Sequence, residues 1–383
     1  MFEDLPTRRA SRHDPMVLLS TEDHRTIPFE ATQPHEVWAA LNPQDHQDLQ
    51  ALCHTFHQML FALPQGLLTG VAAKHYYHRY QQQPYIKETD WMADHSGGAL
   101  SKTQMALAQR AYVVAHAPGA ACSTSVVWDQ TAQQNICMRS LDWAGARQLG
   151  QATRLYQFVD RHGTNRFQAV GNIGMVGLLT AIKPGLCAAI NYAPWTVWGI
   201  EQGLDPLLLL RQLFEDPNVV DYHSALDTLL AWPVSSPVYV TLCGVEKDQA
   251  CVVEFGLKGM RHVRQSQAGL LVQTNHFDPE TSPFVDKNID MPPHPVFKDL
   301  LKMRQRPIED WYASDLLPSS AKRRQLLEQG LRPFNGDAQQ LREKLASLYA
   351  TPPVWNYETA YHALMIPENG TLQVHARRAN PTL

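Results

Sequence analysis

Residues 117–143, APGAACSTSVVWDQTAQQNICMRSLDW, contain the pattern that decides the fold. Two runs rich in β-branched and apolar residues, STSVVW and NICMRSL, flank the polar turn DQTAQQ, which is typical of a β-hairpin. If Trp128 lies near Asn135 in that hairpin, Cys122 returns beside Leu141 and Asp142. Local geometry therefore predicts that residues far apart in this segment meet at one end of a two-stranded ribbon.

The same hairpin brings Arg139 close to Cys122 and Asp142, so that a thiol, a guanidinium and a carboxylate converge. The guanidinium favours a thiolate and any developing anion, and the carboxylate can orient an ammonium or carry protons. A regular strand would point Arg139 and Asp142 to opposite faces, so we expect the strand to end or bulge between them. These residues alone allow two interpretations of Cys122, a catalytic nucleophile or a buried structural cysteine.

Strand and helix patterns are segregated along the rest of the chain. This segregation is typical of an α+β fold, in which helices pack on an antiparallel sheet. Further strands are predicted at 175–182, 186–192, 238–243, 251–255 and 269–274, with a closing hairpin at 361–378 that turns at Asn369-Gly370. Helices are predicted at 207–214, 224–230, 297–305, 320–329 and 338–349.

The part of the chain before the hairpin has a mostly helical pattern. Residues 1–25 look like a loose polar lead-in, and apolar residues then recur at helical spacing between 34 and 116. Ser101 is the expected N-cap of one of these helices. An apolar stretch in this part is either ordinary core or an exposed patch that contacts lipid. Its members are Phe56, Met59, Leu60, Phe61, Leu63, Leu67, Leu68 and Val71.

Composition and charge exclude several classes of protein. The chain has 383 residues, of which 44% are hydrophobic and 18% charged, as in a globular protein. A formal net charge of −4, with basic residues clustered only in short runs such as Arg323-Arg324 and Arg377-Arg378, argues against a nucleic-acid partner. The start carries no apolar signal-like region, and the longest apolar runs are shorter than the roughly 20 residues of a membrane span. A cytoplasmic location is therefore expected.

The cysteines and histidines give little support for a metal site. The six cysteines are scattered without a CxxC pair, which is typical of reduced thiols in a cytosolic protein. The pairs His54/His57 and His75/His78 could each offer two ligands on a helix face, but no acidic or cysteine partner is placed with them. We expect neither a metal nor a cofactor.

The residues around Cys122 resemble the cholylglycine hydrolase and acid ceramidase group of N-terminal nucleophile hydrolases. That group opens its mature chain with Cys-Thr-Ser or Cys-Ser-Ser, followed by an Arg-Asn-x-Asp-like motif; this chain has CSTS at 122–125 and RSLD at 139–142. The stretch 171–195 is similar to the Gly-rich strand and Lys-Pro-Gly turn of acid ceramidase. Asn275 stands where the group has a Thr-Asn-Tyr asparagine, and Arg323-Arg324 resembles its late arginine motif. The resemblance covers residues 25–381.

The resemblance implies a four-layer α/β/β/α sandwich and an autoproteolytic amidohydrolase. Cleavage before Cys122 would leave residues 1–121 as an attached helical pro-segment and 122–383 as the catalytic domain. The new α-amine, with an ordinary pKa of about 8, would serve as the general base.

The resemblance also implies roles for the remaining site residues. Asp142 would hold the α-amine and the leaving nitrogen, Arg139 would support the charged site, and Arg323 would be a further catalytic residue. Asn191 and Asn275 would donate to the oxyanion. For Asn191 a plain turn residue is an equal alternative, and for Arg323 a solvated helix face is one.

The nucleophile and the substrate both have alternatives. The spacing from Cys122 to Arg139 is one residue longer than in the lysosomal members, so an ungapped alignment would make Ser123 the nucleophile; a longer turn is the easier change and favours Cys122. The expected substrate is a small-molecule N-acyl amide with a fatty acyl chain, such as an N-acylethanolamine or a ceramide. Alternatives are conjugated bile acids or penicillin V, and a non-catalytic homologue that acts as an interaction protein. Peripheral membrane contact would come through the pro-segment.

Overall fold

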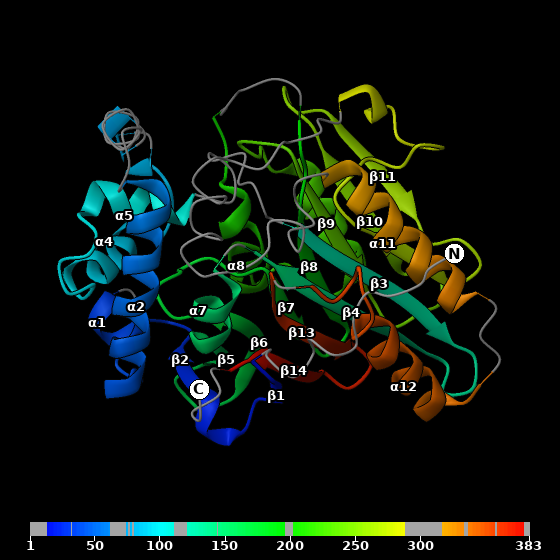
Figure 1. The fold of residues 1–383 in the computed structure, drawn as a ribbon, viewed down its shortest axis with the longest axis horizontal. Coiled ribbons are helices and arrows are strands. Elements are labelled where there is room, and N and C mark those ends of the chain that lie inside the picture. Colours follow the sequence, from blue (N-terminus) through cyan, green and yellow to red (C-terminus); the bar gives the residue numbers. More distant parts are fainter. Residues whose placement is uncertain are drawn as a thin grey trace.

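The protein folds as two stacked β-sheets with helices on their outer surfaces (Figure 1). The structure, a computed structural model, describes residues 14–31, 33–61, 74–75, 77–78, 80–110, 121–143, 145–195, 202–287, 316–332, 336–356 and 358–378. Within these residues the order of layers is helix, sheet, sheet, helix, because strands of the two sheets contact each other on one face and helices on the other. The predicted α+β class and four-layer sandwich are confirmed.

One sheet has six antiparallel strands in the described residues, in the order β1-β14-β13-β4-β3-β12. Their bounds are β1 Met16–Leu18, β14 Thr371–Arg377, β13 Thr359–Ile366, β4 Gln134–Asp142, β3 Ala121–Asp129 and β12 Leu270–Gln273. Helices α11 (Leu316–Leu331) and α12 (Ala338–Tyr349) cover its outer face. Their apolar side chains, such as Leu327 and Leu345, are buried against Val127 and Ile136 of the hairpin.

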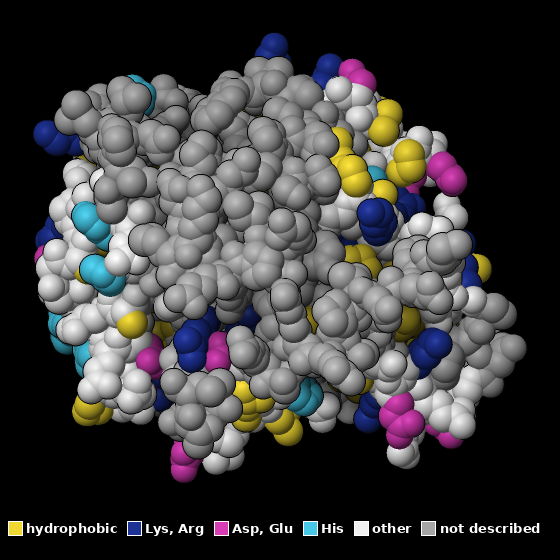
Figure 2. Space-filling model, in the orientation of Figure 1, with side chains coloured by type: hydrophobic (Ala, Val, Ile, Leu, Met, Phe, Trp, Pro, Cys, Tyr) yellow, Lys and Arg dark blue, Asp and Glu magenta, His cyan; other side chains and the backbone are white. Residues whose placement is uncertain are grey.

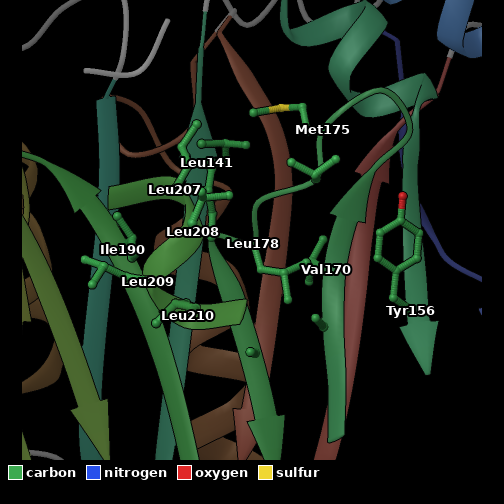
Figure 3. Packing of buried hydrophobic residues seen from close by; sticks show 14 of the residues in the cluster. Leu141, Tyr156, Val170, Met175, Leu178, Ile190, Leu207, Leu208, Leu209 and Leu210 are labelled. Atoms are coloured by element: carbon green, nitrogen blue, oxygen red, sulfur yellow. The ribbon is translucent and has the colours of Figure 1, made fainter. Parts of the chain in front are cut away.

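The other sheet has eight strands in the described residues, in the order β11-β10-β9-β8-β7-β6-β5-β2. Their bounds are β11 Arg261–Gln265, β10 Ala250–Phe255, β9 Val238–Cys243, β8 Leu186–Tyr192, β7 Thr180–Lys183, β6 Asn165–Asn172, β5 Thr153–Val159 and β2 His24–Pro28. Helices α8 (Pro206–Glu215) and α9 (Tyr222–Ala231) cover it. The leucines of α8, Leu207 to Leu210, gather in one apolar cluster with Leu178, Ile190 and Val170 (Figure 3).

The helices before the hairpin gather at one side of the sandwich (Figure 1). Within the described residues they include α1 Pro34–Val37, α2 Pro43–Leu60, α4 Ile86–Asp94 and α5 Lys102–Gln109, and the short α7 (Ala146–Gln151) follows the hairpin. Ser101 caps α5 as predicted, since its side chain accepts from Gln104 N while the Gln104 side chain accepts from Ser101 N. Of the predicted apolar stretch, Phe56 is buried and Phe61 packs on the core; the side chains of the other members, like the predicted helix 297–305, lie outside the described residues.

The prediction of a loose polar lead-in at residues 1–25 is wrong for its described part. Strand β1 pairs with β14 of the six-stranded sheet, and β2 pairs in parallel with β5 of the eight-stranded sheet. Each strand is too short to show a periodic pattern, and its backbone hydrogen bonds come from a partner distant in the chain. The segment before the hairpin therefore contributes strands to both sheets as well as helices.

Three other strand predictions need correction. Strands β5, β6 and β11 were not expected from the sequence, and β7 begins only at Thr180. In the closing hairpin Ile366 pairs with Thr371, so the turn spans four residues, 367–370, in place of the two expected. Gly370 in this turn has φ 69°, a conformation that glycine adopts without strain.

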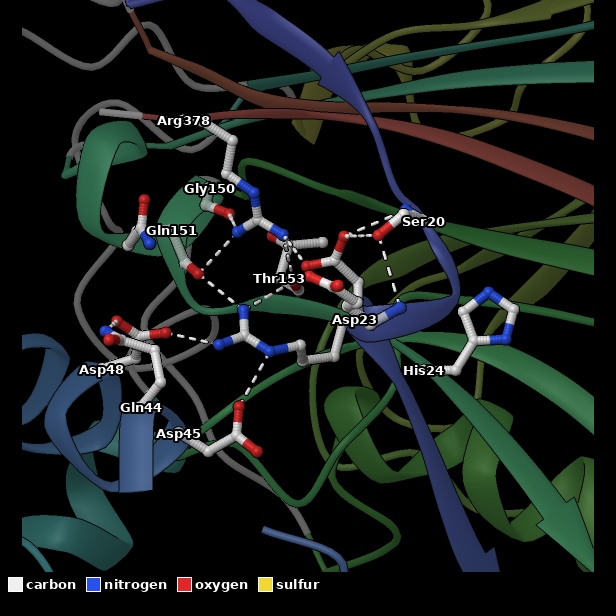
Figure 4. Close-up of polar contacts among 12 residues, drawn as sticks. Ser20, Asp23, His24, Gln44, Asp45, Asp48, Gly150, Gln151, Thr153 and Arg378 are labelled. Carbon is white, nitrogen blue, oxygen red and sulfur yellow. Dashed lines mark hydrogen bonds and ion pairs between the residues drawn. The ribbon is translucent and has the colours of Figure 1, made fainter. Parts of the chain in front are cut away.

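Ion pairs, most of them buried, join the segment before the hairpin to the rest of the sandwich (Figure 4). Arg154 of β5 donates from Nε to Asp45 of α2 at 2.8 Å and also pairs with Asp48. Arg25 of β2 binds the same Asp45 at 2.5 Å, and near the end of the chain Arg378 binds Asp23 at 2.6 Å. Carboxylates from before the hairpin are thereby paired with arginines from both sides of it.

The described surface shows no strong concentration of one charge on the face drawn in Figure 2, where Lys and Arg side chains are dispersed among acidic and neutral ones. Among the described residues, no helix is both long and apolar enough to cross a membrane.

Candidate active site

The hairpin of β3 and β4 has the register that the sequence predicts. Trp128 pairs with Asn135 and Cys122 pairs with Leu141, so the start of β3 lies beside the end of β4. Ala121, the residue before the cysteine, pairs with Asp142. The predicted convergence of Cys122 and Asp142 at one end of the ribbon is thus observed.

The predicted break between Arg139 and Asp142 does not occur in β4. The pairing with β3 continues without interruption to Asp142, and the irregularity lies in β13, between Thr359 and Tyr361. Because β13 takes up the extra residue, β4 stays regular and its alternation holds. Arg139 and Asp142 therefore approach Cys122 from opposite faces of the sheet.

On the face between the two sheets, Arg139 contacts the thiol. Its Nη2 atom lies 3.5 Å from Cys122 Sγ and donates to Ile190 O at 2.8 Å. Its Nη1 atom donates to Thr180 Oγ1 at 3.1 Å and to the hydroxyl of Tyr361. Both Arg139 and Cys122 are 0% exposed. The buried guanidinium is therefore held against the sulfur of Cys122 between the two sheets.

On the outer face, Arg323 of α11 holds the backbone of the cysteine. Its Nη1 atom donates to Cys122 O at 2.6 Å and to Ser123 Oγ at 3.0 Å, and Nη2 donates to Asn275 Oδ1 at 2.9 Å. Burial lowers the pKa of Arg323, and the nearby carboxylate of Asp142 partly offsets this. The side chain is 0% exposed, which excludes the alternative of a solvated helix face.

Asn275 contacts Cys122 through its side-chain oxygen. Cys122 N donates to Asn275 Oδ1 at 2.8 Å, and Asn275 Nδ2 donates to Tyr192 O at 2.9 Å. Ser320 of α11 fixes the backbone of this asparagine, because Asn275 N donates to Ser320 Oγ at 2.6 Å. Since Arg323 lies one helical turn further along α11, the same helix positions both residues.

Asn191 lies nearby but its amide is engaged elsewhere. Its Nδ2 donates to the carbonyl oxygens of Gln273 at 3.1 Å and Thr274 at 3.2 Å, while Oδ1 accepts from Thr124 Oγ1 at 2.7 Å. An amide nitrogen carries two hydrogens, so both are directed at carbonyls in this arrangement. The predicted role of Asn191 as an oxyanion donor would require these bonds to be given up.

Asp142 is fully buried and held by two side chains. Thr359 Oγ1 donates to Oδ1 at 2.8 Å, and Asn356 Nδ2 donates to Oδ2 at 3.2 Å. Burial raises the pKa of Asp142 to about 6, and the charge of Arg323 together with these hydrogen bonds limits the rise. A carboxyl group with such a pKa can exchange a proton near neutral pH.

The two possible nucleophiles occupy different faces of β3. Ser123 Oγ accepts from Arg323 on the side of α11, whereas Cys122 Sγ lies against Arg139 between the sheets. The hydroxyl of Ser123 is used to hold the arginine that also binds Cys122 O. The geometry favours Cys122.

Several residues of this region were not identified from the sequence. Thr180, Ser320, Asn356 and Thr359 belong to loops and elements distant in the chain, and no local pattern marks them. Tyr361 belongs to the closing hairpin, which the sequence predicts as a segment without marking this side chain. Among the described residues, no group of three or more His, Cys, Asp or Glu side chains could hold a metal ion.

The comparisons with known proteins find similarity among solved structures. No family model and no curated protein matches the sequence. Among solved structures, the chain is similar to a Caenorhabditis elegans ortholog of N-acylethanolamine-hydrolyzing acid amidase, with 19% sequence identity and a TM-score of 0.47. The match covers 64% of this chain and 93% of that chain. At this level of likeness, the function has to be argued from the site itself.

Proposed function

We propose that the protein is an N-terminal nucleophile amidohydrolase that activates itself by cleavage before Cys122. The supporting observation is that three polar atoms of this one residue are held by three different side chains. Sγ lies against Arg139, N donates to Asn275, and O accepts from Arg323. A structural cysteine needs none of these contacts, whereas a nucleophile whose own backbone nitrogen takes part in catalysis needs all of them.

The first reaction is cleavage of the chain. Sγ of Cys122 attacks the carbonyl carbon of Ala121, and the C–N bond to Cys122 breaks as the C–S bond forms. The thiol proton passes to the departing nitrogen, which becomes the free α-amine. Water then hydrolyses the thioester, leaving a carboxylate on Ala121 and a free thiol on Cys122. Asn275 Oδ1 already accepts from this nitrogen and would go on accepting from the new amine.

The second reaction repeats this chemistry on an external amide. The α-amine takes the thiol proton, Sγ attacks the acyl carbon, and the amine product leaves with that proton. Water then releases the acid from the thioester. Arg139 stabilises the thiolate, and Arg323 keeps the cysteine backbone in place.

Asn275 is the stronger of the two predicted oxyanion donors. Its Nδ2 carries two hydrogens and gives one to Tyr192 O, so a second can be donated to an oxyanion. Asn191 has both hydrogens directed at carbonyls. Asp142 would stabilise the ammonium form of the new amine from the outer face, because Ala121 pairs directly with it.

For the substrate we propose a linear N-acyl amide with a fatty acyl chain. Cys122 belongs to the large buried apolar cluster that also includes Leu141, Met175 and Leu178, and a core of this kind suits an alkyl chain better than a charged acid. Conjugated bile acids and penicillin V are the rival amides. The alternative of another class is a non-catalytic protein that binds partners. We further propose that residues 1–121 make peripheral contact with a membrane.

Intact mass tests the processing step. The wild-type protein should yield a fragment that begins at Cys122, Cys122→Ala should stay a single chain, and Ser123→Ala should still be cut. A fragment that begins at Ser123 would transfer the role to the serine. A wild-type chain that never cuts and ignores thiol-directed inhibitors would support the non-catalytic rival.

Acyl chain length tests the substrate. On one amine, kcat/KM should rise steeply from acetyl to lauroyl and palmitoyl, because each buried methylene contributes about 0.8 kcal/mol. If kcat/KM does not depend on chain length, or if phenoxyacetyl penicillin or a bile-acid conjugate is clearly preferred, the alternative substrates would be favoured.

A further inference from the structure

Tyr361 lies in the same row of side chains as Cys122. Cys122 pairs with Leu141, and Leu141 pairs in turn with Tyr361 on the next strand. Side chains directly opposite each other on antiparallel strands share one face of the sheet. Arg139 is two residues from Leu141 on the middle strand, so it shares that face and can reach both ends of the row.

The contacts of the guanidinium span this row. Nη1 of Arg139 donates to the Tyr361 hydroxyl and to Thr180 Oγ1, while Nη2 lies 3.5 Å from Cys122 Sγ. The guanidinium carbon is 5.3 Å from the centroid of the Tyr361 ring, within the range of a cation–π interaction. The hydroxyl oxygens of Tyr361 and Thr180 are 3.0 Å apart, and both accept a hydrogen bond from Nη1 of Arg139.

The tyrosine acts on the cation without carrying charge. Burial raises the pKa of Tyr361, so its hydroxyl stays protonated and neutral. A guanidinium is planar and rigid, and fixing one terminal nitrogen therefore sets the direction of the other. Without the hydroxyl, Arg139 would keep its charge and lose one of the groups that set its direction toward the sulfur.

We propose that Tyr361 is a positioning residue that holds the Arg139 guanidinium so that Nη2 faces the sulfur of Cys122. The proposal rests on the proposed function of Cys122 as the nucleophile. Tyr361 acts through Arg139 and does not touch the substrate. Thr180, from the eight-stranded sheet, is the second hydrogen-bond acceptor that holds Nη1 of Arg139 in place.

Tyr361→Phe tests this directly, because it removes the hydroxyl and keeps the ring. Tyr349→Phe is the matched control: Tyr349 of α12 is equally buried, and its hydroxyl donates to the backbone oxygen of Met138, the residue before Arg139 in β4. Two quantities are measured on processed protein. One is kcat and KM for an N-acyl amide, and the other is the rate at which iodoacetamide alkylates Cys122 as a function of pH, followed by mass spectrometry.

Tyr361→Phe should lower kcat about tenfold or more at unchanged KM, since small misplacements of reacting groups have effects of this size. Its Cys122 should be alkylated more slowly across the pH range measured, because the guanidinium no longer faces the sulfur. Tyr349→Phe should keep the wild-type values of both. If the two variants behave alike, the positioning role is wrong.

The two readouts also separate this inference from the proposed function. If no amide is hydrolysed and Cys122 in Tyr361→Phe is still alkylated more slowly, the positioning role stands and the amidase proposal fails. If Tyr361→Phe does not fold, Thr180→Val removes the other hydroxyl from the same nitrogen. Slower alkylation of Cys122 in this variant would support the inference, and an unchanged rate would overturn it.

Discussion

Two buried regions of this molecule use arginine in opposite ways. In the network of ion pairs around helix α2, Arg154 is paired with the carboxylates of Asp45 and Asp48, so that their charges cancel. In the hairpin site, Arg139 binds hydroxyls and a carbonyl and turns one nitrogen toward Cys122. Both arginines are buried, so burial alone does not reveal their roles. What distinguishes them is whether the positive charge is neutralised locally or directed at a reactive atom.

The contrast extends to the acids. Burial raises the pKa of Asp45, but its hydrogen bond to Arg25 and the charge of Arg154 outweigh this, and the net pKa is lowered. For Asp142 burial dominates, and the pKa rises to about 6. A fully paired carboxylate stabilises the fold at neutral pH, whereas an incompletely compensated one weakens it and stays available for proton chemistry.

The largest effect on activity is expected for Arg139→Ala. Loss of the cation beside the thiol should reduce kcat/KM by on the order of 10²–10³-fold, the size seen when one preorganised electrostatic group is removed. The measurement is kcat/KM together with the extent of self-cleavage. Arg154→Ala is the matched comparison and should keep its activity per folded molecule. Unchanged turnover in cleaved Arg139→Ala would remove this arginine from the mechanism.

Arg154→Ala should lower the free energy of unfolding and leave the activity per folded molecule unchanged. It leaves Asp48 buried without its arginine, and breaking a buried pair in this way reduces the free energy of unfolding by about 3–5 kcal/mol. Urea unfolding measures the change. Lys102→Ala, which removes an exposed pair with Asp94, is the control and should change it by less than about 1 kcal/mol. Equal effects of the two substitutions would contradict a structural role for the network.

The smallest effect is a pH dependence carried by Asp142. Its folded pKa of about 6 exceeds the ordinary 3.8, so the folded chain binds an extra proton between these values. The free energy of unfolding should therefore fall as pH rises from about 4 to about 6, by on the order of 3 kcal/mol. Asp142→Asn should lack this fall. Urea unfolding at pH 4 and pH 7, with Cys122→Ala in both proteins to prevent cleavage, measures it; parallel pH profiles would show that Asp142 is not the titrating group.

Local sequence could predict the hairpin, and with it one end of the site. Alternating apolar residues and a polar turn are short-range signals, and a hairpin has few possible registers. The partners Cys122–Leu141 and Trp128–Asn135 followed from that geometry alone. The prediction failed where it treated β4 in isolation, because the irregularity that it placed between Arg139 and Asp142 is taken up by β13.

Short N-terminal strands could not be predicted in the same way. Strand β1 has three residues and β2 has five, and neither run shows a clear alternation. Their stability comes from hydrogen bonds to β14 and β5, strands that stand far away in the chain. The position of such a strand is determined by the strands it pairs with, and its own residues carry almost no pattern that predicts it.

The sequence by itself determined the α+β class, the hairpin and the position of Cys122 at its end, because these depend on periodicity and on contacts close in the chain. Only the tertiary structure decided which atoms face the cysteine. Strand alternation put Arg139 on one face and Asp142 on the other, and packing of α11 and β13 brought Arg323 and Tyr361 to them. The physical reason is that side-chain partners across a sandwich are chosen by packing between elements, which no local pattern records.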